Sequence, residues 1–369
     1  MNRENKVIKK QQIIAFCIVM LMLFGSIVLL EKTQLKELKA HAPLMLEAAE
    51  RTAVAFEQIK QKRLDLGFPI DLKLDPNSTG MIGVKSSDIT TTQGMLSSKR
   101  STTNPNIAAL FIDFFVGLGL EEGDGVAFNL SGSFPALNAA ALIAADVLGI
   151  NAIVISSIGS SSYGANIPDF TWQDMERHLV DIGILKTQSV AVSLGGDGDA
   201  GTSFPDNIRQ NIIARMIEHD YTFINNADFE ENLSERIYIY GNVKAFVNIG
   251  GNIFTFGTKG SSEPDLFGLI SRKRSAELGN GLLAYYLEQG VPVIHFLNMR
   301  DLLSDNGFPY DPSPLPALGK GEIYYTIYNN KVVTVIAIIS IILSCTVLFF
   351  ASSAANRLHL VCVYRKIVR

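Results

Sequence analysis

The stretch that decides the fold covers residues 126–156 and reads VAFNLSGSFPALNAAALIAADVLGINAIVIS. It opens with the apolar run 126–130 and closes with a second β-rich run at 152–156. Between the two lies the Ala- and Leu-rich segment 135–148, which begins with Pro135, a residue suited to the first turn of a helix. A strand, a helix and a second strand in this order form a βαβ unit with parallel strands. The stretch therefore predicts an α/β fold.

The same alternation continues on both sides of this unit. We expect further strands at 189–194, 244–249 and 291–297, and further helices at 105–118, 172–182, 206–218 and 276–289. This order predicts a largely parallel sheet with helices on both faces.

Two long apolar runs flank the α/β region. Residues 13–30 are interrupted only by Gly25 and Ser26, and residues 332–350 form a second run. Each has the roughly 18 to 20 residues that cross a hydrocarbon core of about 30 Å. The first run is too long for the apolar core of a cleaved signal peptide, and LEKT at 30–33 offers no small-residue cleavage site. We therefore expect one transmembrane helix near each end of the chain. The first of them is an uncleaved signal anchor.

The charges outside these runs predict the orientation of the chain. Basic residues precede the first run and follow the second: Arg3, Lys6, Lys9 and Lys10, then Arg357, Arg365, Lys366 and Arg369. Positively charged flanks stay inside, so both termini of this two-pass cell-membrane protein should be cytoplasmic and the main domain extracytoplasmic. The two ends carry formal charges of +3 and +4, so the total of −4 leaves −11 for the residues between them. Such an acidic region argues against a nucleic-acid partner.

The expected domains follow from these boundaries. In chain order we expect a cytoplasmic N-terminus (1–12), the first transmembrane helix (13–30), a helical stalk (31–79), the α/β domain (80–331), the second transmembrane helix (332–350) and a cytoplasmic tail (351–369). Residues 31–66 read as one helical stretch that Pro43 could break or kink. For this helical stretch, a stalk that packs one face on the domain is favoured over a helix that binds a partner protein. The cysteines, Cys17, Cys345 and Cys362, all lie outside the domain, so a disulfide or cysteine-based metal site is excluded there.

Small and hydroxyl residues follow four of the predicted strands. Candidate ligand-binding residues in these loops are Ser131, Gly132, Ser133, Ser156, Ser157, Gly195 and Gly196, and GGN at 250–252 follows the fourth strand. Ligands of a parallel sheet bind beyond the carboxyl ends of its strands, where amides and hydroxyls can hold a carboxylate or phosphate. One such loop indicates only a tight turn, but four on one edge indicate a ligand site.

A hydroxyl-rich and basic segment lies upstream of the first strand. It contains Thr90, Thr91 and Thr92, followed by Lys99 and Arg100. Arginine binds carboxylates through two parallel hydrogen bonds, so this pair is a candidate for carboxylate recognition. The alternative is a solvated basic pair beside a well-capped helix.

Evidence for a cofactor or an active centre is weaker. Gly196, Gly198 and Gly201 match the spacing GxGxxG, but Asp197 and Asp199 between them would repel a pyrophosphate. The two aspartates are weak candidates for a divalent cation, and no other cofactor is predicted.

The motifs of the common hydrolases and nucleotide-binding sites are missing from the sequence. It contains no P-loop, no HExxH and no GxSxG. A hydrolase would therefore need an unorthodox nucleophile such as Ser131 or Ser133, with His295 as the best-placed general base. A single histidine at a strand end is more often structural.

Three motifs carry a resemblance to a known family. DITTTQG (88–94), KRSTTNP (99–105) and LSGSFPALN (130–138) resemble the poly-γ-glutamate system protein family. The resemblance continues in ISSIG (155–159), YGAN (163–166), FTW (170–172) and SLGG (193–196). It spans nearly the whole outer domain and is weakest in the helices at the two ends.

The resemblance implies a biological setting without a reaction. Proteins of this family accompany the ATP-dependent amide ligase and the small integral-membrane subunit that make and export poly-γ-glutamate. The expected partners are therefore these synthase subunits, the polymer and the membrane.

Three functional hypotheses remain. The first is an accessory component that binds or guides the polymer or organises the synthase. The second is an extracytoplasmic amidohydrolase or transpeptidase acting on γ-glutamyl bonds. The third is a structural clamp without a ligand.

Overall fold

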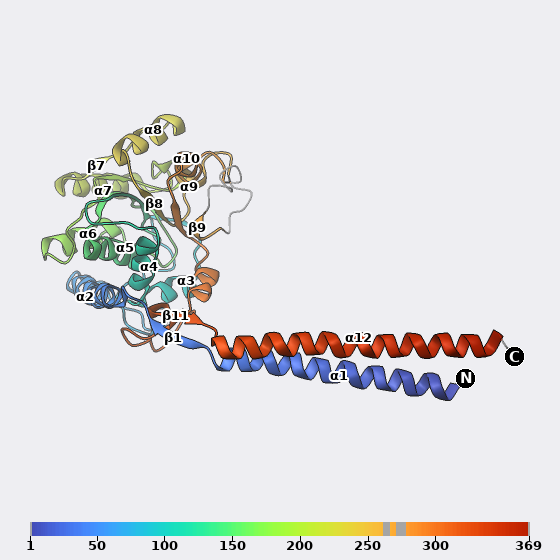
Figure 1. Cartoon of the computed structure of the whole chain (residues 1–369). Coiled ribbons are helices and arrows are strands. Elements are labelled where there is room, and N and C mark those ends of the chain that lie inside the picture. The colour runs from blue at the N-terminus through green and yellow to red at the C-terminus, as the bar shows by residue number, and fades with distance from the viewer. Residues whose placement is uncertain (1, 261–265, 271–277, 368–369) are drawn as a thin grey trace. The chain divides into compact units, whose positions relative to one another are not determined.

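The computed structural model describes residues 2–260, 266–270 and 278–367 (Figure 1). The chain divides into two compact units. One unit joins the two ends of the chain, residues 1–38 and 325–369, and the other contains residues 39–324. The larger unit contains the α/β fold and the candidate site.

A seven-stranded sheet forms the centre of the larger unit. Its strands lie in the order β7-β6-β4-β3-β8-β10-β9 and are parallel except for β9, which is antiparallel to β10. The strands are β3 (Gly125–Ser131), β4 (Asn151–Ser157), β6 (Ala191–Ser193), β7 (Thr222–Phe223), β8 (Ala245–Ile249), β9 (Gly268–Ile270) and β10 (Val293–Phe296). The predicted mixed α/β fold with a largely parallel sheet is confirmed.

The helices of this unit are α2 (Ala42–Asp65), α3 (Leu96–Thr102), α4 (Ile107–Gly117), α5 (Pro135–Leu148), α6 (Trp172–Asp181), α7 (Asp206–Glu218), α8 (Phe229–Tyr240), α9 (Ile253–Phe256), α10 (Leu282–Glu288) and α11 (Met299–Asp305), with short 3-10 turns at Asp197–Asp199 and Glu322–Tyr324. They include the predicted ones at 135–148, 172–182 and 206–218, whereas α8, α9 and α11 were not predicted. The helix predicted at 276–289 is shorter than expected. Its first two residues lie outside the described part, and Gly279 adopts a left-handed φ of +80°, which an α-helix does not accommodate.

Helices cover both faces of the sheet. Phe128 of β3 packs against Phe115 of α4, with 6.1 Å between ring centroids. Because Phe128 lies beside Val247, the neighbouring Phe246 points to the opposite face. There Phe246 stacks on Tyr286 of α10 at 4.5 Å. The two aromatic contacts place one apolar layer on each side of β3 and β8.

Residues 31–66 were predicted as one helical stretch that Pro43 could break, and the structure breaks the stretch before Pro43. Helix α1 (Asn2–Lys32) ends before a short strand, β1 (Leu35–Leu38), and α2 starts only at Ala42. Pro43 lies in the first turn of α2, where its missing N–H costs no hydrogen bond, whereas inside a continuous helix it would break one. Strand β1 pairs antiparallel with β11 (Tyr325–Tyr328), a partner from the other end of the chain.

Helix α2 is part of the folded unit. It packs against α4, α5 and α6. The buried face includes Met45, Ala49, Phe56 and Ile59, which recur at helical spacing. A large apolar face of this kind stabilises the unit by removing apolar area from water.

The smaller unit contains β1, β11 and two long helices, α1 and α12 (Lys331–Ile367), which run side by side (Figure 1). Their apolar segments, Ile13–Lys32 and Lys331–Phe350, have mean hydropathies of 3.0 and 2.8 and are long and apolar enough to cross a membrane. Ala337 and Ser344 of α12 are buried, so small residues form its contact with α1.

The side chains of Arg3, Lys6 and Lys9 and of residues 351–369 lie outside the described part. The orientation of the chain in a membrane, which was predicted from these charges, stays a prediction.

Candidate functional site

The carboxyl edge of the sheet gathers segments that are distant in the sequence. Strand β2 (Thr90–Thr92) pairs in parallel with β5 (Ser160–Ser161), which follows the end of β4. The methyl group of Thr91 lies against the loop after β4 and the loop after β6: a Cβ added to Gly159 or Gly196 would lie 2.7 or 3.1 Å from it. Glycine is needed at 159 because any side chain there would collide with Thr91.

The loops after β3 and β8 meet at the same edge. The amide of Gly132 donates to the Ser157 carbonyl at 2.9 Å, which joins the loops after β3 and β4. Gly250, with a left-handed φ of +95°, approaches Ser131 so closely that an added Cβ would be 3.0 Å from the serine Cβ. The structure therefore brings the four predicted loops and Thr90–Thr92 together.

A polar hollow of about 550 Å³ opens beside β2, and we call it the hydroxyl pocket. Its nine described lining residues are Lys85, Ser86, Thr90, Thr91, Thr92, Gln93, Gly94, Ser162 and Tyr163. None of the nine is acidic, and Lys85 is exposed. Hydroxyl, amide and ammonium groups donate hydrogen bonds, so this lining suits an anionic ligand.

Asn166 holds the wall of the hydroxyl pocket in place. Its side chain accepts a hydrogen bond from the Val84 amide at 2.9 Å and donates to the Val84 carbonyl at 2.8 Å and to Thr90 Oγ1 at 3.0 Å. The backbone adds a bond from the Tyr163 amide to the Val84 carbonyl at 2.9 Å. The segments on the two sides of the pocket are thus fixed to each other.

Lys99 lies behind the pocket and not on the surface. Its side chain is almost fully buried, and Nζ donates to the Ser133 carbonyl at 2.5 Å and lies 2.7 Å from Ser161 Oγ. Nζ also lies 3.5 Å from the centre of the Phe134 ring. Burial lowers the pKa of Lys99 to about 7, because desolvation disfavours the ammonium form.

Arg100 is occupied by an internal carboxylate. Its Nε donates to Asp311 Oδ1 at 2.7 Å, and its Nη2 donates to the other carboxylate oxygen. The hydrogen bonds to Asp311 raise the pKa of Arg100. We expected Lys99 and Arg100 to recognise a carboxylate from outside, but the structure buries the first and pairs the second with Asp311. The exposed cation at the pocket is Lys85.

The two weak metal candidates do not form a described cation site. Asp199 is buried, and its carboxylate accepts hydrogen bonds from Ser193 Oγ at 2.8 Å and from Arg236 Nη2 at 2.5 Å. The side chain of Asp197 lies outside the described part. The described residues contain no group of three or more His, Cys, Asp or Glu side chains that could hold a metal.

His295 lies on β10, which β8 separates from β3 and the serines that were its predicted partners. Asn248 donates to its Nδ1 at 2.9 Å, which places the proton of the neutral ring on Nε2. Burial lowers the pKa of His295 to about 4, so the ring is neutral at physiological pH.

Ser131 and Ser133 make local contacts instead. Ser131 Oγ accepts from the Ser133 amide at 3.1 Å, and Ser133 Oγ accepts from the Ser161 amide at 3.0 Å. Within the described residues, no hydrogen bond joins either serine to His295. The two serines and the histidine therefore do not form a nucleophile and base.

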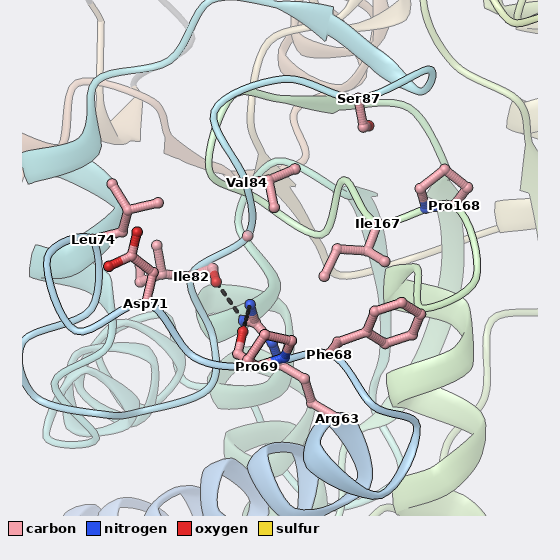
Figure 2. A pocket seen from close by; sticks show the side chains of 11 residues that line it. Arg63, Phe68, Pro69, Asp71, Leu74, Ile82, Val84, Ser87, Ile167 and Pro168 are labelled. Atoms are coloured by element: carbon pink, nitrogen blue, oxygen red, sulfur yellow. Dashed lines mark hydrogen bonds between the residues drawn. The ribbon is translucent and has the colours of Figure 1, made fainter.

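A second hollow, of about 340 Å³, has a different chemistry (Figure 2). Its lining is mainly apolar and includes Phe68, Leu74, Ile82 and Ile167. The guanidinium of Arg63 points toward the Ile82 carbonyl, as the dashed line shows. The same group donates to the carbonyls of Gly80 at 3.0 Å and Pro69 at 3.2 Å. Arg63 thus holds the surrounding loops together. Because its guanidinium is occupied and the lining is mainly apolar, this hollow is less suited to a polyanion than the hydroxyl pocket.

Several residues of the site were not predicted. Lys85 and Tyr163 lie outside the predicted loop positions, whereas Ser161 and Ser162 continue the serine-rich loop that follows Ser156 and Ser157. That run of serines was the available signal. Comparisons of the chain with protein-family models, with curated proteins and with solved structures give no match.

Proposed function

We propose that this chain is a membrane-anchored accessory component of poly-γ-glutamate synthesis or export, whose α/β unit binds the polymer in the hydroxyl pocket. The observation that carries the proposal is the lining of that pocket. Its nine described residues include hydroxyl donors and Lys85 and no carboxylate, although residues 13–350 carry a formal charge of −11. An acidic protein that binds a polyanion needs a local site of this kind, which has no carboxylate.

The chemistry of the polymer fits this lining. Each γ-linked glutamate carries one free carboxylate, and hydroxyl and ammonium groups donate to carboxylates. An exposed ion pair contributes only about 0.2–1 kcal/mol and a neutral hydrogen bond about 0.5–1.5 kcal/mol. One pocket therefore holds one segment weakly, and neighbouring segments of the same chain rebind at high effective concentration. Weak, repeated binding suits a component that guides a growing polymer.

The two apolar helices supply the membrane anchor in this proposal. Helices α1 and α12 cross the cell membrane with both termini in the cytoplasm, and the larger unit lies outside, where exported polymer emerges. The small residues Ala337 and Ser344 already lie in the contact between the two helices. The outward faces of the pair then remain for the integral-membrane subunit of the synthase.

Polymer production in cells tests the proposal. The test uses a strain that makes poly-γ-glutamate and carries this chain as its only copy of the protein. In that strain Lys85→Glu should reduce the amount of secreted polymer several-fold. The matched control is Lys320→Glu, which makes the same charge change at another exposed lysine of the larger unit. Equal polymer yields from the two variants, at equal protein levels, would refute binding at the hydroxyl pocket.

A further inference from the structure

A lysine and a serine lie in direct contact behind the hydroxyl pocket. Lys99 Nζ lies 2.7 Å from Ser161 Oγ, and both side chains are largely buried. Lys99 comes from α3 and Ser161 from β5, so two separate elements bring the pair together. Among the described residues, Lys99 has no carboxylate partner. A buried lysine without a counter-ion is costly as an ammonium ion, which favours its neutral form.

The partners of Nζ fit both the ammonium form and the neutral form of lysine. Neutral lysine has two N–H groups and one lone pair in a tetrahedral arrangement. One N–H donates to the Ser133 carbonyl, and the second faces the Phe134 ring. In the ammonium form the third N–H donates to Ser161 Oγ, and in the neutral form the lone pair can accept the proton of this hydroxyl instead. This is the contact that a general base makes with a nucleophile.

Titration of Lys99 falls in the physiological range. Burial, the cause of the shift, lowers its pKa to about 7. The other charged or titratable groups around α3 fall into three sets. Arg100 pairs with Asp311, and Tyr310 is bonded to Ser97 and Ser98. Helix α11, which packs on α3, contributes Arg300, Asp301 and Asp305, and the pocket lining contributes Lys85 and Tyr163. Near neutral pH a large fraction of Lys99 is therefore unprotonated.

Gly94 links this pair to the hydroxyl pocket. It lines the pocket, and a Cβ added to it would lie 3.0 Å from Ser161 Oγ and 3.2 Å from Lys99 Cε. Only a residue without a side chain fits there, because the Gly94 backbone packs directly against the pair. Ser162, the residue after Ser161, also lines the pocket, so the pair lies directly behind the pocket wall.

We propose that Ser161 is the nucleophile and Lys99 the general base of an acyl-transfer site that acts on amide bonds. That the amide belongs to the polymer rests on the proposed function, and the dyad itself does not. Serine–lysine pairs are one of the recurring arrangements that activate a serine.

The reaction balances with water or an amine as the second substrate. Ser161 Oγ attacks the amide carbonyl carbon and passes its proton to Lys99 Nζ. The C–N bond breaks, the lysine ammonium gives its proton to the leaving amine, and an ester remains on Ser161. Water then attacks the ester and gives a proton to Lys99. The Oγ–acyl bond breaks, Lys99 returns the proton to Ser161 Oγ, and the products are a carboxylic acid and an amine. An amine in place of water gives transpeptidation.

Covalent labelling of the full-length protein tests this site. A fluorophosphonate probe is incubated with the detergent-solubilised chain between pH 6 and 9, and the labelled residue is found by mass spectrometry. We expect the label on Ser161, with a rate that rises with pH and has its midpoint near the Lys99 pKa of about 7. General-base catalysis contributes at least about 10²-fold, so Lys99→Met should slow labelling by that factor. Ser161→Ala should abolish it.

The controls separate chemistry from folding. Lys73→Met and Ser234→Ala change exposed residues outside the site and should label like the wild type. The pH profile of the unmutated chain reads the Lys99 titration even if Lys99→Met unfolds. The proposal is overturned if folded wild type carries no label on Ser161 at any of these pH values, or if Lys99→Met labels at the wild-type rate.

Polymer binding by the same preparations distinguishes the two proposals. Binding without labelling removes the acyl-transfer site and leaves the accessory function. Labelling without binding removes the polymer as ligand and leaves the dyad with another amide substrate. Ser161→Ala, which leaves the lining of the pocket intact, should still bind polymer.

Discussion

Individual buried polar residues account for much of the pH behaviour expected of this protein. Glu176 of α6 is fully buried and accepts hydrogen bonds from the Ser189 amide at 3.0 Å, Ser189 Oγ at 2.8 Å and the Tyr221 hydroxyl at 2.9 Å. Burial nevertheless raises the pKa of Glu176 from 4.5 to about 7, because the three neutral donors offset only part of the desolvation.

This shift by itself predicts a loss of stability with rising pH. His295 and Lys99, whose pKa values are lowered, act in the opposite direction, so the effect of Glu176 is the difference between wild type and Glu176→Gln. The folded state binds more protons than the unfolded state between pH 4.5 and about 7. The contribution of Glu176 is therefore fully present below pH 4.5 and is lost as the pH rises through about 7. The loss is on the order of 3 kcal/mol, and Glu176→Gln should remove it.

Urea unfolding at pH 5 and pH 8 measures this effect. The single tryptophan, Trp172, is buried in the same helix and reports on it by fluorescence. Glu218→Gln, at an exposed position of α7, is the matched control and should keep the wild-type pH dependence. If Glu176→Gln also kept it, the buried carboxyl would not be its source.

The buried ion pair between Arg236 and Asp199 makes a second prediction. Both side chains are at most 2% exposed. Arg236→Met leaves the Asp199 carboxylate buried without its cation and should lower the free energy of unfolding by about 3–5 kcal/mol. Adding Asp199→Asn removes the unpaired charge and should recover part of the loss. Denaturant unfolding of the two single variants and the double variant measures this coupling. It is contradicted if the double variant loses as much unfolding free energy as the two single variants together.

At the scale of elements, α2 illustrates how a helix that follows the first long apolar segment in the sequence belongs to the folded unit. Met45 is fully buried, whereas Val54 on the other side of the same helix is 53% exposed. Met45→Ala should therefore cost about 2–5 kcal/mol of unfolding free energy. Val54→Ala should stay within about 0.5 kcal/mol. A free stalk would instead tolerate both substitutions equally well, and thermal or urea unfolding separates the two cases.

Elements with strong internal patterns were predicted well, and those that depend on distant partners were not. The proline-initiated, alanine-rich α5 matches its predicted bounds. Strand β1 was missed because LKEL has no strand pattern of its own, and its partner β11 lies near the other end of the chain. The edge strands β7 and β9 have only two and three residues, which is too short for a periodic signal.

The site shows the same limit. The serine- and glycine-rich loops could be placed on one edge because parallel strands present their carboxyl ends together. The sequence did not show which way each polar side chain would point. Lys99 and Arg100 are adjacent on α3, and a helix turns about 100° per residue. One consequently points inward to Ser161 and the other toward Asp311.

For the whole molecule, the orientation across the membrane is a separate prediction. The larger unit has no cysteine of its own, since Cys17, Cys345 and Cys362 all lie outside it. With these three replaced by serine, Lys320→Cys should react with an impermeant maleimide in intact cells. Lys10→Cys should react only after lysis. If instead Lys10→Cys reacted in intact cells and Lys320→Cys only after lysis, the α/β unit would lie in the cytoplasm. The proposed role outside the membrane would then be wrong.

Equilibrium binding of γ-linked glutamate oligomers to the detergent-solubilised full-length chain tests the central claim most directly. We expect weak binding to the wild type that declines with added salt, because screening weakens contacts between exposed charges. Lys85→Ala should weaken binding by up to about 5-fold, the worth of one exposed ion pair, and Lys320→Ala should leave it unchanged. Absence of binding by the folded wild type, or equal affinity of the two variants, would contradict polymer recognition at the hydroxyl pocket.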